Sequence, residues 1–240
     1  MKRTDTPTNS TSDQIAGIVL TATAVLMVFA MLHHPIPHAH SVDELVIEVD
    51  QIQFVNGLVH GGAIVFAMLM VLGLISFCER LGFHRVSVRA GMISFCVGAS
   101  ALIFASLVSG FIVPTFLDGY EIANPADALT GQRVLSALRS TNISLDVLGV
   151  STISIALALF GFSALFRSPR LWVIGLLGLT SGCVGVGGLF TGHTQATVPG
   201  VIAFAVLLGI WLISVGVYLL RRPLPEVKDE SSTEPSEMES

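Results

Sequence analysis

The chain has 240 residues, of which 52% are hydrophobic and only 12% charged, with a formal net charge of −5. Soluble domains carry about a quarter charged residues, so this composition excludes an ordinary water-soluble fold. The mean hydropathy of +0.78 points the same way. We therefore expect the chain to lie in a lipid bilayer, and we expect no nucleic-acid partner.

Six apolar stretches are long enough to cross a hydrocarbon core about 30 Å thick, which takes about 20 helical residues. They cover residues 15–32, 54–77, 90–113, 143–166, 171–190 and 198–220. Residues 1–13 are polar, and residues 223–240 are acidic with few aliphatic side chains. The sequence thus predicts an all-α, polytopic six-helix transmembrane bundle over residues 14–222 between two disordered tails.

Basic residues indicate the orientation of this bundle. Ten of the twelve lie before the first span, between the second and third, between the fourth and fifth, and after the sixth; Arg133 and Arg139 alone fall on the other side. Because short cytoplasmic loops collect Lys and Arg, both termini are predicted to be cytoplasmic. The expected location is a cell membrane, namely the inner membrane of a bacterium.

Two helices are predicted to begin well before their apolar spans. Ser41 to Glu44 reads as a capping box, which would start the second helix near Val42. Asn124 followed by Pro125 reads as an N-cap with proline at the first helical position. A single helix from there through the fourth span would be far longer than one crossing, so we expect a break at Gly131.

Glycines recur along the fifth span at spacings of three, four and three residues, which places them on one helix face. Such a face lets a neighbouring backbone approach closely in lipid, so we interpret it chiefly as a packing surface. The residues are Gly175, Gly178, Gly182 and Gly185. The three cysteines are far apart and form no C-x-x-C, so we interpret Cys78, Cys96 and Cys183 as small buried apolar residues.

Polar side chains inside the second and fourth spans are the first candidates for a site, because ionisable groups in a bilayer are costly. His60 shares a helix face with Gln53 and Asn56, and Asp146 shares one with Arg139 and Asn142. Since His60 and Asp146 fall at similar depth, an Asp–His pair could bind a metal ion, move a proton or hold a polar ligand. The plainer interpretation is that each is hydrogen bonded and fixes helix packing.

Histidines cluster between the first two spans, in the segment His33-His34-Pro-Ile-Pro-His38-Ala-His40, and His193 follows the fifth span on the same side. Imidazole suits zinc, copper, nickel and haem iron. The spacing matches no standard zinc pattern, and a loop rich in proline and histidine can simply be solvated. The candidate metal ligands are His34, His38, His40 and His193.

No common enzyme motif is present, and we predict a non-enzymatic membrane protein. The leading hypothesis is an outward-facing His/Asp site that binds or conducts a small cation, a divalent metal ion or a proton. The alternatives are a redox subunit with haem or quinone at the outer face, and a structural or sensory subunit. A divalent metal is the preferred cofactor over haem, and the partners would be a second copy or another membrane protein.

Overall fold

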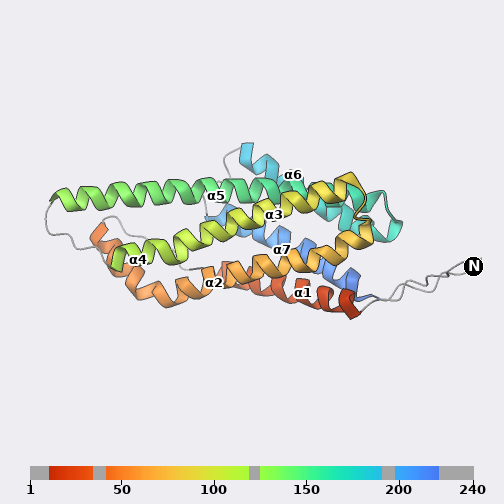
Figure 1. Ribbon diagram of the computed structural model, residues 1–240, viewed down its shortest axis with the longest axis horizontal. Coiled ribbons are helices and arrows are strands. Elements are labelled where there is room, and N and C mark those ends of the chain that lie inside the picture. The colour runs from red at the N-terminus through yellow and green to blue at the C-terminus, as the bar shows by residue number, and fades with distance from the viewer. Residues whose placement is uncertain (1–10, 35–41, 119–124, 191–197, 222–240) are drawn as a thin grey trace, which may run out of the picture.

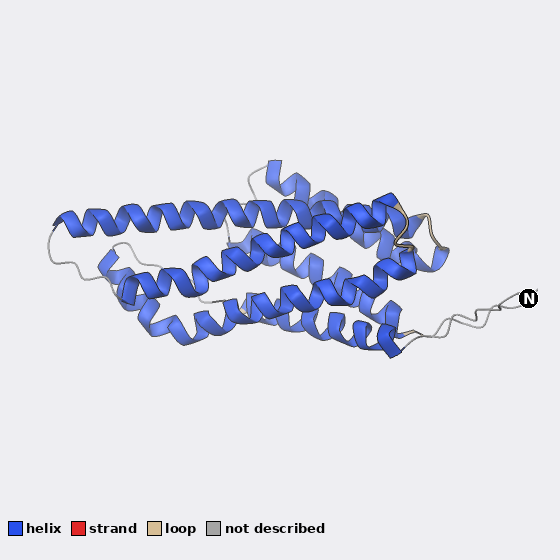
Figure 2. Ribbon diagram, viewed as in Figure 1, coloured by secondary structure: helices blue, strands red, loops and turns tan. Residues whose placement is uncertain are grey.

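The computed structural model describes residues 11–34, 42–118, 125–190 and 198–221. Within these ranges the chain forms helices joined by short turns and contains no strand (Figure 2). Among the described residues, six helices are long and apolar enough to cross a membrane. The segments that we predicted as disordered tails lie mostly outside the described residues, although the first helix already begins at Thr11.

The helices follow one another as an antiparallel bundle (Figure 1). Helix α1 packs against α2 and α7, α2 against α3, α3 against α5, α5 against α6, and α6 against α7, which closes the ring. The bounds are Thr11–Leu32 for α1, Val42–Leu81 for α2, Val86–Leu107 for α3, Val108–Ile112 for the π-helix η1, Val113–Asp118 for α4, Pro125–Leu165 for α5, Pro169–Leu171 for the short 3-10 helix η2, Trp172–Phe190 for α6 and Val198–Leu220 for α7.

The bundle has two chemically different ends. The starts of α2 and α5 and the whole of α4 lie together at one end, on the left of Figure 1. We call it the histidine end, because His34 and His60 lie towards it. We call the opposite end, on the right, the arginine end, because the turns after α2 and α5 there carry Arg85 and Arg167.

Helices α2 and α5 begin where the capping signals predicted, at Val42 and Pro125, but the break predicted at Gly131 is wrong. Helix α5 runs unbroken for 41 residues, or about 62 Å at 1.5 Å per residue. One glycine costs a helix only about 1 kcal/mol relative to alanine, and the flanking residues are good helix formers. Gly131 is also buried.

The third helix does not end at Val113, as the apolar stretch suggested, but continues through η1 into α4. The reason is Pro114, which lacks an N–H and whose ring clashes with the carbonyl four residues earlier, that of Gly110. The wider π turn, in which Val113 N–H donates to Val108 O, moves this carbonyl away while the helix continues. The proline therefore reshapes the helix without stopping it.

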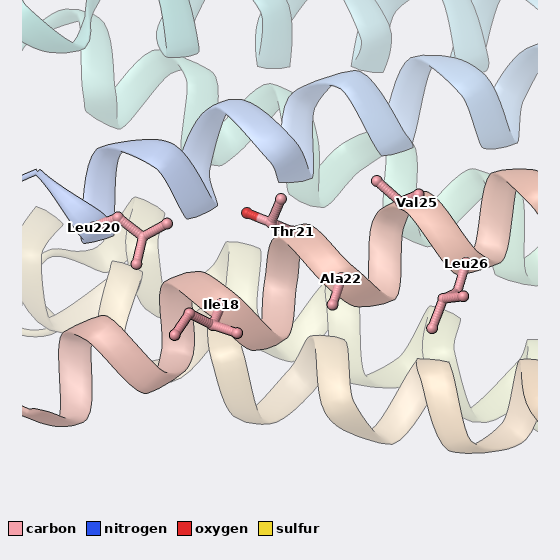
Figure 3. Close-up of a pocket in the computed structure, with 6 residues that line it drawn as sticks. All are labelled: Ile18, Thr21, Ala22, Val25, Leu26 and Leu220. Atoms are coloured by element: carbon pink, nitrogen blue, oxygen red, sulfur yellow. The ribbon is translucent and has the colours of Figure 1, made fainter.

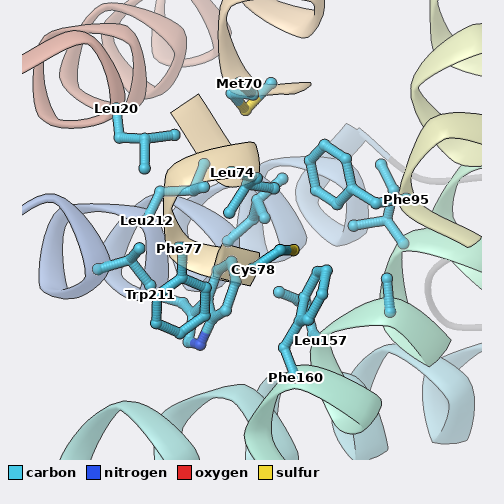
Figure 4. Close-up of a cluster of buried hydrophobic side chains, with 14 of the residues drawn as sticks. Leu20, Met70, Leu74, Phe77, Cys78, Phe95, Leu157, Phe160, Trp211 and Leu212 are labelled. Atoms are coloured by element: carbon cyan, nitrogen blue, oxygen red, sulfur yellow. The ribbon is translucent and has the colours of Figure 1, made fainter. Parts of the chain in front are cut away.

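The buried hydrophobic cluster lies in the half nearer the arginine end, and Figure 4 shows part of it. Trp211 is fully buried, stacks on Phe160 at 5.9 Å between ring centroids, and meets Phe77 edge-on at 5.8 Å. Its Nε1 donates a hydrogen bond of 3.2 Å to the Ile174 carbonyl. Aromatic side chains from α2, α5 and α7 therefore fill this half of the bundle.

Glycines form the closest helix contacts, as the spacing along the fifth span suggested. A Cβ added at Gly178 would lie 2.9 Å from the Leu157 carbonyl, and one at Gly182 would lie 2.5 Å from the Ser154 carbonyl, both on α5. Gly175 and Gly185 face the same helix, against Leu165 and Ser154. The glycine face of α6 is thus the α5–α6 contact. Of the three cysteines predicted to be buried, Cys78 is buried, whereas Cys96 is half-buried and Cys183 is exposed on α6.

Candidate functional site

Two imidazoles meet at the histidine end. His34 Nε2 lies 3.2 Å from His60 Nε2, and the rings are nearly perpendicular, with centroids 5.0 Å apart. Both side chains are half-buried. Because one nitrogen of such a contact must carry a hydrogen while the other accepts it, a neutral pair has one Nε2–H between the rings and the second ring protonated on Nδ1.

The end of α1 positions His34. The helix ends at Leu32, and His34 N–H still donates to the Met31 carbonyl at 3.4 Å. The neighbouring His33 takes another direction: its Nδ1 donates to the Phe29 carbonyl at 2.9 Å, its ring lies on Phe29, and its side chain is exposed. Adjacent histidines therefore have different surroundings, and His34 alone joins the pair.

The π-helix positions His60 from the other side. A Cβ at Gly110 would overlap the His60 side chain, so α2 approaches η1 closely at this point. One turn earlier on α2, Asn56 is buried and donates from Nδ2 to the Ser109 carbonyl at 3.1 Å. Gln53, which we placed on the same polar face, is exposed. The polar face of α2 thus contacts η1 at two points, through the hydrogen bond of Asn56 and the close approach of His60 to Gly110.

Asp146 has separate surroundings. Its Oδ2 accepts a hydrogen bond of 3.3 Å from Asn142 Nδ2 one turn away on α5, whereas Arg139 is exposed. Asn142 Oδ1 is buried and has no hydrogen-bond partner. Helix α3 and η1 pack against both α2 and α5, and α2 and α5 also contact each other directly. The contacts given by the structure join His60 to α1 and η1, and Asp146 to α5.

The remaining predicted metal ligands cannot be placed. His38, His40 and His193 fall in segments 35–41 and 191–197, outside the described residues. Within the part of the chain that is described, no three His, Cys, Asp or Glu side chains converge as a metal site would require. The structure therefore supplies two imidazoles for a metal ion, and any further histidine ligands would have to come from these two segments.

One hollow on the surface is apolar and shallow. It lies along α1 beside the end of α7 (Figure 3), and its lining residues are Ile18, Thr21, Ala22, Val25, Leu26 and Leu220. Thr21 is its one hydroxyl-bearing side chain, and that hydroxyl donates to the Gly17 carbonyl at 2.9 Å. The groove thus offers van der Waals contact, as lipid chains do, and no polar recognition.

The sequence interpretation missed η1 and its contacts with Asn56 and His60. The signal was Pro114, four residues after Gly110, because a helix can continue past a proline through a wider π turn. Comparison with models of known families, with curated proteins and with solved structures gives no match. Any function proposed for the chain therefore rests on the chemistry of its own side chains.

Proposed function

We propose that the protein is a non-enzymatic membrane protein that binds a divalent transition-metal ion at its outer surface, with His34 and His60 as two of the ligands. In this proposal both termini are cytoplasmic and the histidine end faces outward, in agreement with the bias of basic residues towards the arginine end. The location would be a cell membrane, the inner membrane in a bacterium.

The observation that carries the proposal is the distance of 3.2 Å between the two Nε2 atoms. Imidazole nitrogens bind zinc at about 2.0–2.1 Å, so two ligands of a tetrahedral ion lie about 3.3 Å apart. A metal ion could therefore bind both Nε2 atoms once the hydrogen between them has moved to Nδ1 of its own ring, which leaves both rings neutral. Neutral imidazole is also the form in which histidine binds metals.

Further ligands would come from the chain between α1 and α2. His38 and His40 follow His34 within six residues, and Pro35 and Pro37 restrict the backbone between them. A restricted backbone loses less conformational entropy when it is ordered around an ion. Zinc sites that are not fully closed by protein take three protein ligands and water, so one of these histidines would complete a site of that kind.

Binding fits the packing better than conduction does. Between the histidine pair and the arginine end lie the fully buried side chains of Leu74, Phe77 and Trp211. An ion has no polar partners among these groups, and an uncompensated charge in apolar surroundings is very costly. A sensory or capture role at the outer surface therefore needs fewer assumptions than a pore.

Haem at this pair is a weaker proposal. Two axial imidazoles lie on opposite faces of a porphyrin, with nitrogens about 4 Å apart at metal–nitrogen bonds of about 2 Å. His34 and His60 are in direct contact and nearly perpendicular, which leaves no slot between them. A structural subunit that binds a partner or a second copy stays the alternative if no ion is bound.

The test is calorimetric titration of the purified full chain in detergent with Zn²⁺ and Cu²⁺. We expect His34→Ala and His60→Ala each to weaken binding by about tenfold or more, with a non-additive double variant because both residues serve one site. His33→Ala is the matched control, since that ring is exposed and bound to Phe29. Asp146→Asn should also leave the affinity unchanged, because Asp146 contacts Asn142.

Two results would contradict the proposal. The first is a wild-type chain that binds neither ion at micromolar concentration. The second is a His33→Ala variant that loses as much affinity as His34→Ala. The metal ion would then be bound by the histidines of the solvated loop, and the contact between His34 and His60 would not matter. Thermal melting of every variant separates loss of ligand from loss of fold.

A further inference from the structure

Sulfur atoms from two helices meet in the half of the core nearer the arginine end. Cys78 on α2 is fully buried, and its Sγ lies 4.0 Å from Sδ of Met92 on α3, which is itself 8% exposed. Cys96 follows Met92 by four residues, so it projects from the same side of α3 one turn on. It packs, partly buried, against the same core. Figure 4 shows Cys78 inside this cluster, among Leu74, Phe95 and Phe160.

The chemistry of this group differs from that of the histidine pair. Thiolate and thioether sulfurs are soft ligands that select Cu(I), zinc or iron–sulfur clusters over hard cations. Structural zinc takes four protein ligands, one more than these three sulfurs provide. At a metal–sulfur distance of about 2.3 Å, two ligands of a trigonal ion lie about 4.0 Å apart, which matches the Cys78–Met92 separation.

We propose that Cys78 and Met92, together with Cys96, form a buried site for a soft monovalent metal ion, Cu(I). In the metal-free state the Cys78 thiol donates to the Met92 thioether, which is a weak acceptor. On binding, the Cys78 S–H proton leaves to solvent as the copper–sulfur bond forms, and copper stays in the +1 state. This proposal goes beyond the outer metal site and does not depend on it.

The position of the site indicates how an ion would enter. Cys78 lies three residues before Leu81, the end of α2, and the turn to α3 spans only residues 82–85. Gly82 there has φ +97°, which permits this tight turn. Cys78 and Met92 are thus within two helical turns of the arginine end, and Cys96 lies about one turn deeper. In the proposed orientation that end is the cytoplasmic side, where thiols stay reduced.

The experiment is a competition for Cu(I). The full chain in detergent, with ascorbate to keep copper reduced, is titrated into the coloured Cu(I) complex of bathocuproine disulfonate, and loss of colour reports transfer. We expect wild type to withdraw one Cu(I) per chain, and Cys78→Ser and Met92→Leu each to weaken binding about tenfold or more. Cys183→Ser, which removes an exposed thiol, and His33→Ala, which removes a ring that contacts Phe29, should bind like wild type.

Met92→Leu protects the test from a folding artefact, because leucine nearly conserves the volume and the apolar character of methionine. If this variant melts like wild type and still withdraws Cu(I) with wild-type affinity, the proposal is wrong. It also fails if wild type withdraws no copper, or if Cys183→Ser abolishes the transfer. Zn²⁺ in tenfold excess should leave Cu(I) bound, and displacement by zinc would overturn the assignment to a soft monovalent ion.

Discussion

Asp13 and Arg80 form the ion pair that joins α1 to α2 near the arginine end. Arg80 donates to Asp13 Oδ2 through Nη2 at 2.7 Å and through Nε at 3.2 Å, and the two side chains are 22% and 12% exposed. Two donors from one guanidinium fix the orientation as well as the distance. Because both groups are largely removed from water, removing one partner leaves the other desolvated.

We therefore predict that Arg80→Ala lowers the free energy of unfolding by about 1–3 kcal/mol, the cost of a buried group left without its partner. Thermal melting in detergent measures it. The double variant with Asp13→Ala should lose less than the two single losses added together. Strict additivity would show that the two side chains stabilise the fold separately, and that the pair contributes nothing.

At the scale of single residues, the sequence could predict which side chains have chemistry but not which of them meet. His60 and Asp146 fall at similar depth, and this suggested one site. Depth along a helix says nothing about rotation around the bundle, however, and the contacts that the structure gives join His60 to His34 and η1, and Asp146 to Asn142. The meeting of His34 with His60 depends on how α1 ends, which no spacing rule gives.

At the scale of helices, prediction was more successful. Apolar length gave six long helices, and the capping signals gave the starts of α2 and α5. The break expected at Gly131 was wrong because we treated a glycine as a stop, and the apolar stretch that ended at Val113 did not indicate that the helix continues through Pro114. A long helix that is held by its neighbours can include a glycine or widen around a proline, because packing outweighs about 1–3 kcal/mol of local propensity.

The α5–α6 contact provides a prediction with an internal control. Gly182→Leu should destabilise the bundle by about 1–3 kcal/mol or more, because the added side chain would meet the Ser154 carbonyl and the Ala158 backbone. Gly187→Leu on the same helix should change stability by less than about 0.5 kcal/mol, since a Cβ there has no atom within 4 Å. Equal melting temperatures for the two variants would mean that α6 does not pack closely through Gly182.

At the scale of the whole molecule, the closed ring buries its aromatic core in one half and leaves many large apolar side chains on the outside. Phe54, Phe104 and Val173, for example, are 83%, 58% and 67% exposed. In water such a surface would drive aggregation, whereas in a bilayer it contacts lipid chains. Helices α2 and α5 are longer than one crossing requires, so part of each would extend beyond the bilayer at the histidine end.

Both metal proposals assign a side of the membrane, and single-cysteine labelling tests that assignment. In a chain whose native cysteines are replaced by alanine, Gln132→Cys on the exposed start of α5 should react with a membrane-impermeant maleimide in intact cells. His84→Cys, exposed in the turn after α2, should react only after permeabilisation. The physical reason is that basic residues, among them Arg85 and Arg89, gather at the arginine end.

If His84→Cys reacts in intact cells and Gln132→Cys does not, the orientation is reversed. The histidine pair would then face the cytoplasm, and an outer capture site would be untenable even if the purified chain binds zinc.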